Sequence, residues 1–94
     1  MKLGRVTGSI TATAKDPALS GLSMLVVDIV DASGDVLEPG LVAVDRVGAG
    51  PDDLVLVTTG SAVRTAHGLA MVPADAAIIA IIDDLNAGSS SGKR

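Results

Sequence analysis

The chain has 94 residues, 48% of them hydrophobic, with no aromatic residue and no cysteine, and 11 carboxylates against 7 Lys and Arg give a net charge of −4. The acidic balance and the missing rings argue against a nucleic-acid binder, which needs cations for phosphates and aromatic platforms for bases. The lack of cysteine excludes disulfides, thiolate metal sites and cysteine nucleophiles.

Three strands are predicted in the first half of the chain. Alternation predicts a strand over residues 3–13, whose glycines indicate a sharp bend or a close approach between backbones. An aliphatic run over residues 22–30 predicts a largely buried strand. Turn-forming residues occupy positions 31–35, and the returning strand is expected over residues 41–47.

The second half predicts a turn over residues 48–53, a strand over 54–59 and a short helix over 61–67, which Ser61 can cap. Residues 75–85 are ambiguous, because the alanines and the leading aspartate favour helix whereas four isoleucines favour strand. We choose strand, because five strands and one short helix close a barrel. The expected fold is therefore mostly β, a small five-stranded OB-like β-barrel with one short helix.

The length predicts a single domain over residues 1–85, followed by a flexible Gly- and Ser-rich tail over residues 86–94. The longest apolar run, residues 76–82, is too short to cross a bilayer, so we expect a cytoplasmic protein without a membrane partner. This much aliphatic surface on a small acidic domain indicates that part of it faces other subunits, because monomers rarely expose large apolar patches.

The loop Gly48-Ala49-Gly50 offers two flexible backbone positions that can cradle a phosphate or line a narrow opening. A dinucleotide loop needs a third glycine and a following helix, whereas a strand is expected to follow here. A tight turn between strands is the favoured interpretation of the loop alone, and no cofactor is implied.

Carboxylates gather around the first turn and invite a calcium hypothesis, but their spacing does not match an EF-hand loop, so solvated turn carboxylates are preferred to a metal site. The residues concerned are Asp28, Asp31, Asp35 and Glu38. A carboxylate-dependent hydrolase built on Asp28, Asp45 or Asp83 ranks last among the possible functions, because no pair has a spacing that compels acid–base roles.

Arg64 stands in the predicted helix among small apolar residues. Its guanidinium favours a bidentate carboxylate partner, which Asp75, Asp83 or an acidic residue of another subunit can supply. The alternative is a solvent-exposed arginine whose stem covers small side chains. The residues alone leave the two interpretations even.

Taken in order, a string of short motifs resembles the EutN/CcmL family, the pentameric vertex proteins of bacterial microcompartment shells. The similarity extends to about Leu85, and Ala62 and Val63 depart from it where the family often shows serine and alanine before the arginine. The motifs are Asp45-x-Val47-Gly48-Ala49-Gly50, Val55-Leu56, Gly60-Ser61-x-x-Arg64, Pro73-x-Asp75-Ala76 and Ala80-Ile81-Ile82-Asp83.

The resemblance implies a non-enzymatic homopentamer that caps the vertices of a shell whose facets are tiled by hexameric shell proteins. It implies that Gly48, Ala49 and Gly50 lie near the five-fold axis and its pore. It also implies that the segment from Ser61 to Arg64 lies close to a subunit contact, with Asp75 and Asp83 as further interface candidates. The competing function is an OB-type small-ligand or oligonucleotide-binding module, which the acidic balance disfavours for nucleic acid.

Overall fold

The computed structural model describes residues 1–11, 17–19, 21–60, 63 and 74–85. These residues form five strands and one 3-10 turn, η1, that lies between the first two strands. Their bounds are β1 (Lys2–Ile10), η1 (Pro17–Leu19), β2 (Ser23–Val30), β3 (Val36–Asp45), β4 (Leu54–Thr59) and β5 (Ala76–Ile81).

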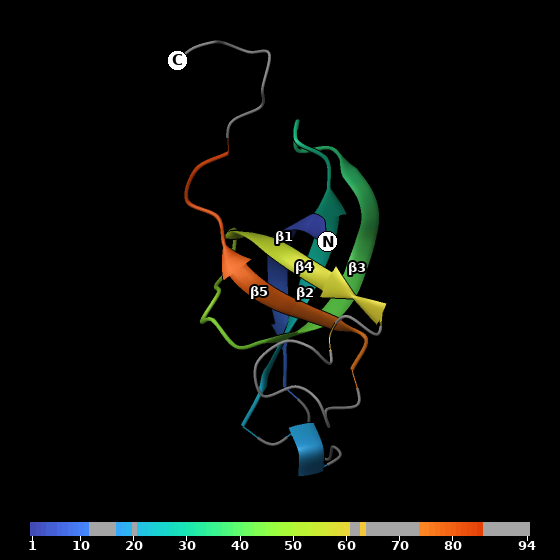
Figure 1. The fold of residues 1–94 in the computed structure, drawn as a ribbon, viewed down its shortest axis with the longest axis vertical. Helices are drawn as coiled ribbons and strands as arrows, with labels where there is room; N and C mark the ends of the chain where they lie inside the picture. The colour runs from blue at the N-terminus through green and yellow to red at the C-terminus, as the bar shows by residue number, and fades with distance from the viewer. Residues whose placement is uncertain (12–16, 20, 61–62, 64–73, 86–94) are drawn as a thin grey trace.

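The strands form a closed barrel in the order β1-β2-β3-β5-β4, and β4 returns to β1 (Figure 1). All neighbours are antiparallel except β3 and β5, which run parallel and pair only through Val44 with Ala77 and Asp45 with Ile78. The expected five-stranded, mostly antiparallel OB-like barrel is confirmed.

The ambiguous last element is a strand, as predicted, although β5 covers only Ala76–Ile81 of the expected 75–85. The returning strand was placed too late, because β3 begins at Val36 and ends at Asp45 rather than running over residues 41–47. Glu38-Pro39-Gly40 reads locally as a loop, yet its backbone continues the ladder with β2 across two register shifts. The predicted helix over residues 61–67 and the tail over 86–94 lie outside the described residues, apart from Val63.

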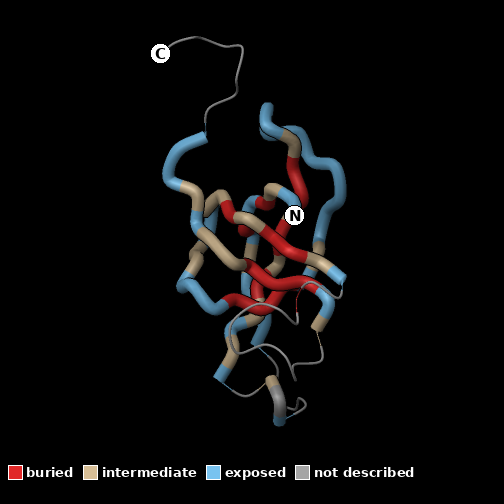
Figure 2. Tube along the Cα trace, viewed as in Figure 1, coloured by how far each residue is buried: buried red, intermediate tan, exposed pale blue. Residues whose placement is uncertain are grey.

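Small aliphatic side chains fill the barrel interior. Figure 2 shows the buried residues as red segments of the central strands. The fully buried positions include Val6, Val27, Val55, Val57 and Ile78, one or more from nearly every strand. A core without aromatic rings must bring its backbones close together. Accordingly Gly4 on β1 is buried, and a Cβ built there would collide with the side chain of Val27.

A second apolar cluster lies on the outer face of the barrel. Successive strand residues point to opposite faces, so Val44 and Ala77 point outward where Ala43 and Ile78 point into the main core. Val63 completes this cluster and is fully buried. The cluster therefore holds Val63, the residue before Arg64, against the barrel.

Candidate functional site

The loop that carries Gly48, Ala49 and Gly50 connects β3 to β4, and a buried carboxylate at the end of β3 organises its first half. Asp45 is only 7% exposed. Its Oδ1 accepts a hydrogen bond from the backbone N of Val47 and its Oδ2 accepts one from the backbone N of Ala49, both at 3.0 Å. Gly48 between them has φ +82°, a conformation that glycine adopts at no steric cost.

The second half of the loop is closed by Asp53. The backbone N of Gly50 donates to Asp53 Oδ2 at 2.8 Å, and the backbone N of Asp53 donates back to the Gly50 carbonyl at 3.1 Å. Ala49 packs its methyl group against the barrel core. The loop backbone is therefore held by the carboxylates of Asp45 and Asp53 and by the packing of Ala49 against the core, and these contacts define one backbone shape.

The loop is also fastened to β1. The backbone N of Asp52 donates to the Val6 carbonyl at 2.9 Å, and the backbone N of Val6 donates to the Asp53 carbonyl at 3.0 Å. Arg5 Nη1 adds a hydrogen bond to the Asp52 carbonyl at 2.8 Å. These contacts extend the β1–β4 ladder beyond Leu54 and hold the loop against the barrel wall.

The structure separates the two aspartates proposed for subunit contacts. Asp75 and Asp83 are both exposed, but they flank opposite ends of β5. The Asp75 carbonyl accepts a hydrogen bond from the backbone N of Gly60 at 2.8 Å, which places Asp75 beside the residue that precedes Ser61. Ser61 and Arg64 themselves lie outside the described residues.

Asp83 lies instead near the glycine loop. It follows Ile82, whose backbone N donates to the Leu54 carbonyl at 2.8 Å, at the point where the loop returns to β4. The three carboxylates offered for a hydrolase do not converge either. Asp28 Oδ1 accepts the backbone N–H of Gly40 at 3.0 Å, Asp45 is occupied by the glycine loop, and Asp83 stands exposed after β5.

Hydrogen bonds within the acidic turn between β2 and β3 occupy the carboxylate of Asp31. Asp31 Oδ1 accepts the Ser33 hydroxyl at 2.6 Å and the backbone N–H groups of Ser33 and Asp35 at 2.9 and 3.0 Å. The hydroxyl bond is the main cause that lowers the pKa of Asp31 below its ordinary value of 3.8. Across the described part of the chain, no three His, Asp or Glu side chains are grouped as a metal site would require.

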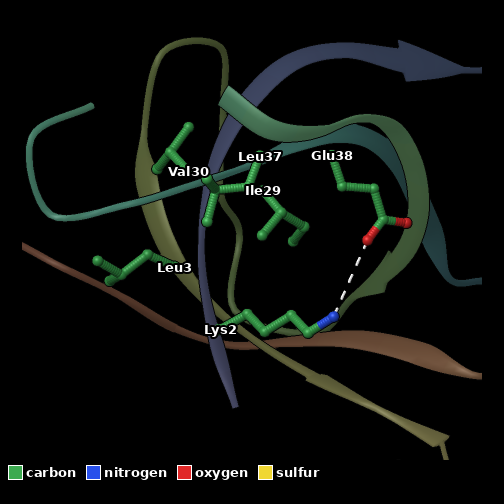
Figure 3. Close-up of a pocket in the computed structure, with 6 residues that line it drawn as sticks. All are labelled: Lys2, Leu3, Ile29, Val30, Leu37 and Glu38. Carbon is green, nitrogen blue, oxygen red and sulfur yellow. Dashed lines mark ion pairs between the residues drawn. The ribbon is translucent and has the colours of Figure 1, made fainter. Parts of the chain in front are cut away.

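A pocket of about 420 Å³ opens where the start of β1 meets the β2–β3 hairpin. Figure 3 shows four aliphatic side chains around it and Lys2 reaching toward Glu38. The Lys2 Nζ and Glu38 Oε1 atoms are 3.9 Å apart. The aliphatic lining consists of Leu3, Ile29, Val30 and Leu37.

The glycine loop is recognisable from the residue types in the sequence, whereas the roles of Asp45 and Asp53 in shaping it were not predicted. Asp45 precedes its backbone donors Val47 and Ala49 by two and four positions, and aspartate commonly accepts a bond from the backbone two residues ahead of it. That spacing was a usable signal. The pocket had no such signal in the sequence, because Leu3, Val30 and Leu37 meet only when three strands pair.

None of the helices formed by the described residues has the length and apolar character that crossing a membrane would demand.

Comparisons with known proteins agree with this architecture along nearly the whole chain. A family model described as "Ethanolamine utilisation protein EutN/carboxysome" matches residues 1–83. The carboxysome shell vertex protein CcmL of Synechococcus elongatus is 42% identical over 91 residues, which are 97% of this chain and 92% of that protein.

Two further relatives come from other microcompartments. The bacterial microcompartment shell vertex protein EutN of Salmonella typhimurium is 39% identical over 88 residues, covering 94% of this chain and 89% of that protein. The solved structure of GrpN, a pentameric microcompartment shell protein from Rhodospirillum rubrum, superposes with a TM-score of 0.81 at 35% identity and covers 92% of this chain and 98% of that chain. By sequence and by fold, the chain belongs to the EutN/CcmL family.

Proposed function

We propose that this protein is a structural shell protein that assembles into a homopentamer and caps the vertices of a bacterial microcompartment in the cytoplasm. The observation that carries the proposal is the match to relatives named as shell vertex proteins over more than nine-tenths of the chain. The pentameric description of the Rhodospirillum rubrum relative supports a ring of five.

The proposed role depends on the shape of the subunit and on its contacts with other subunits, and it does not require a reactive group. A sheet of hexagons is flat, and pentagons introduce the curvature that closes it. We therefore propose hexameric shell proteins of a different fold as partners. The OB-type ligand or oligonucleotide module is not favoured, because the relatives reported above are shell proteins.

Within the ring, Gly48, Ala49 and Gly50 are proposed to face the five-fold axis. Support comes from the rigid shape of their loop, since Asp45 and Asp53 hold its backbone at four hydrogen bonds. A loop of this kind keeps an opening at one width. The segment from Ser61 to Arg64 and the exposed Asp75 are proposed to lie near a subunit contact, as the motif order implies.

Native mass spectrometry at micromolar chain concentration tests the assembly. The expected particle has five times the chain mass of 9.3 kDa. A stable monomer or dimer would contradict the proposal. Co-expression with hexameric shell proteins tests the vertex role, because closed shells should form with this chain and only open sheets or tubes without it.

A further inference from the structure

The β3–β5 seam, formed by Val44, Asp45, Ala77 and Ile78, is the shortest ladder of the barrel within the described residues. Only Val44 with Ala77 and Asp45 with Ile78 are paired there, and every other ladder is longer. Parts of a fold with few backbone pairs and little buried apolar area open at a lower cost in free energy than the rest. The seam is therefore the place where the barrel wall separates most easily.

The apolar cluster on the outer face holds this seam closed. Val44 and Ala77 point outward from the two sides of the seam and form one cluster with Val63, which is fully buried. Leu22 and Met24 pack against the cluster and are partly buried. Because Ala77 supplies a single methyl group, most of the apolar contact outside the seam depends on Val44 and Val63.

Asp45 connects the seam to the glycine loop. Its backbone is paired with Ile78 across the seam, and its carboxylate accepts the backbone N–H groups of Val47 and Ala49 at 3.0 Å. One residue thus belongs both to the seam and to the first half of the loop. If Asp45 moves away from Ile78, its carboxylate moves with it and the two N–H groups lose their acceptor.

The second half of the loop is held by different contacts. The backbones of Asp52 and Asp53 are hydrogen-bonded to the backbone of Val6 on β1, and Arg5 Nη1 donates to the Asp52 carbonyl. These contacts involve neither β3 nor β5. Opening of the seam would therefore release residues 46–49 and leave the second half of the loop in place.

We infer that the β3–β5 seam is a latch for the first half of the glycine loop. The closed seam fixes residues 46–49 through Asp45, and an open seam releases them. Val63 controls the latch, because it packs on the seam from outside. For the opening at the five-fold axis the inference rests on the proposed function, since a loop placed there would change the shape of the passage with the state of the seam.

Residue-resolved amide hydrogen exchange of the assembled protein tests the latch. Val63→Ala should accelerate exchange about tenfold at Val47 and Ala49 relative to Asp52 and Asp53, because truncating a buried side chain weakens the contact that closes the seam. Equal acceleration in both halves of the loop, or no acceleration in either, would overturn the inference.

Two further variants guard against a general loss of stability. Val44→Ala truncates the other large side chain of the outer cluster and should have the same selective effect as Val63→Ala. Val27→Ala is the matched control, because it removes the same atoms from a fully buried position of the main core on β2. It should leave the exchange ratio between the two halves of the loop at its wild-type value, and a ratio raised as much as in Val63→Ala would contradict the latch.

Thiol labelling gives an independent readout, because the chain has no cysteine of its own. Ala49 packs against the core, so Ala49→Cys should react slowly with a maleimide. Addition of Val63→Ala should accelerate the labelling, and addition of Val27→Ala should not. Equal labelling rates in the three backgrounds would also overturn the inference.

Native mass spectrometry of the same proteins separates this inference from the proposed function. A five-chain wild type in which Val63→Ala leaves the loop unchanged would remove the latch and leave the proposed function standing. A wild type that is not pentameric would remove the proposed function, whereas selective exchange at Val47 and Ala49 would still support the latch within one chain.

Discussion

The carboxylate of Asp28 on β2 accepts the backbone N–H of Gly40 on β3 at 3.0 Å, at the point where the ladder between the two strands shifts register. Gly40 has φ +74°, which a side chain tolerates poorly. The shift leaves a backbone donor without a ladder partner, and Asp28 supplies the acceptor. One carboxylate thus allows β3 to pass through Pro39-Gly40 and continue to the hairpin.

We expect Gly40→Ala to lower the free energy of unfolding by about 1–2 kcal/mol, because the left-handed conformation strains a Cβ. Urea unfolding at fixed chain concentration measures the loss, since oligomer stability depends on concentration. Val36→Ala is the control, because that side chain is 52% exposed on the same strand. Equal stability of Gly40→Ala and wild type would show that the bulge is not held in this conformation.

Gly4→Ala should destabilise the barrel by about 1–3 kcal/mol, the usual cost of overpacking a core. The new methyl group would run into Val27 and crowd Val57, whose Cγ2 lies 3.1 Å from its position. Gly8→Ala on the same strand is the matched control, because nothing lies within 4 Å of a Cβ there. Thermal unfolding of the two variants should separate them clearly, and similar melting temperatures would contradict the packing argument.

Asp45→Ala should cost about 1–3 kcal/mol, because it leaves the backbone donors of Val47 and Ala49 without their acceptor in a part-buried site. Amide hydrogen exchange should accelerate at those two positions and not in β1. Arg46→Ala, at the neighbouring exposed position, should stay within about 0.5 kcal/mol of wild type. Unchanged exchange in Asp45→Ala would show that other contacts hold the loop.

Arg64→Ala should weaken ring formation more than it weakens subunit folding if the partner of this arginine lies across the interface. The motif order motivates this prediction, and Arg64 lies outside the described residues. Native mass spectrometry across a dilution series reports the ring, and circular dichroism of the diluted chain reports the fold. Equal losses in both would place the partner within the same chain.

Lowering the pH should remove a small contribution that Asp31 makes to the free energy of unfolding. Its pKa is lower in the folded chain than its ordinary value of 3.8, chiefly through the Ser33 hydroxyl, so the unfolded chain takes up the proton first as the pH falls. The contribution is therefore present above that ordinary value and is lost as the pH falls through the folded value. Asp31→Asn should flatten this acid limb in urea midpoints, and Ser33→Ala should reproduce most of the effect. An unchanged limb in both variants would contradict it.

The strands that could be predicted from the sequence are those whose local pattern agrees with the barrel. β4 has the expected bounds, because Leu54–Thr59 lies between two clear breaks. The isoleucines of β5 outweighed its alanines. The start of β3 could not be predicted, because Pro39 and Gly40 signal a loop and only the distant Asp28 makes a strand possible there.

The candidate site also has features that the sequence predicts and features that depend on pairing between distant strands. The glycine loop was recognisable from its residue types, whereas the bonds from Asp52 and Asp53 to β1 depend on a strand far away in the sequence. The opposite placement of Asp75 and Asp83 follows from the length of β5 and its pairing with β4. Leu37 precedes the predicted strand over residues 41–47, and only the closed barrel shows that it belongs to β3 and remains exposed.

The barrel order places β5, the fifth described strand along the chain, between two earlier ones, since β5 separates β3 from β4. A nascent chain on the ribosome therefore cannot complete its circle of strands until β5 has emerged, because those long-range pairings require it. A complete barrel that can pair with other copies therefore forms only after β5 has left the ribosome. Polypeptides truncated by a premature stop before β5 would expose the unpaired edges of β3 and β4. They would be substrates for proteolysis and would not assemble.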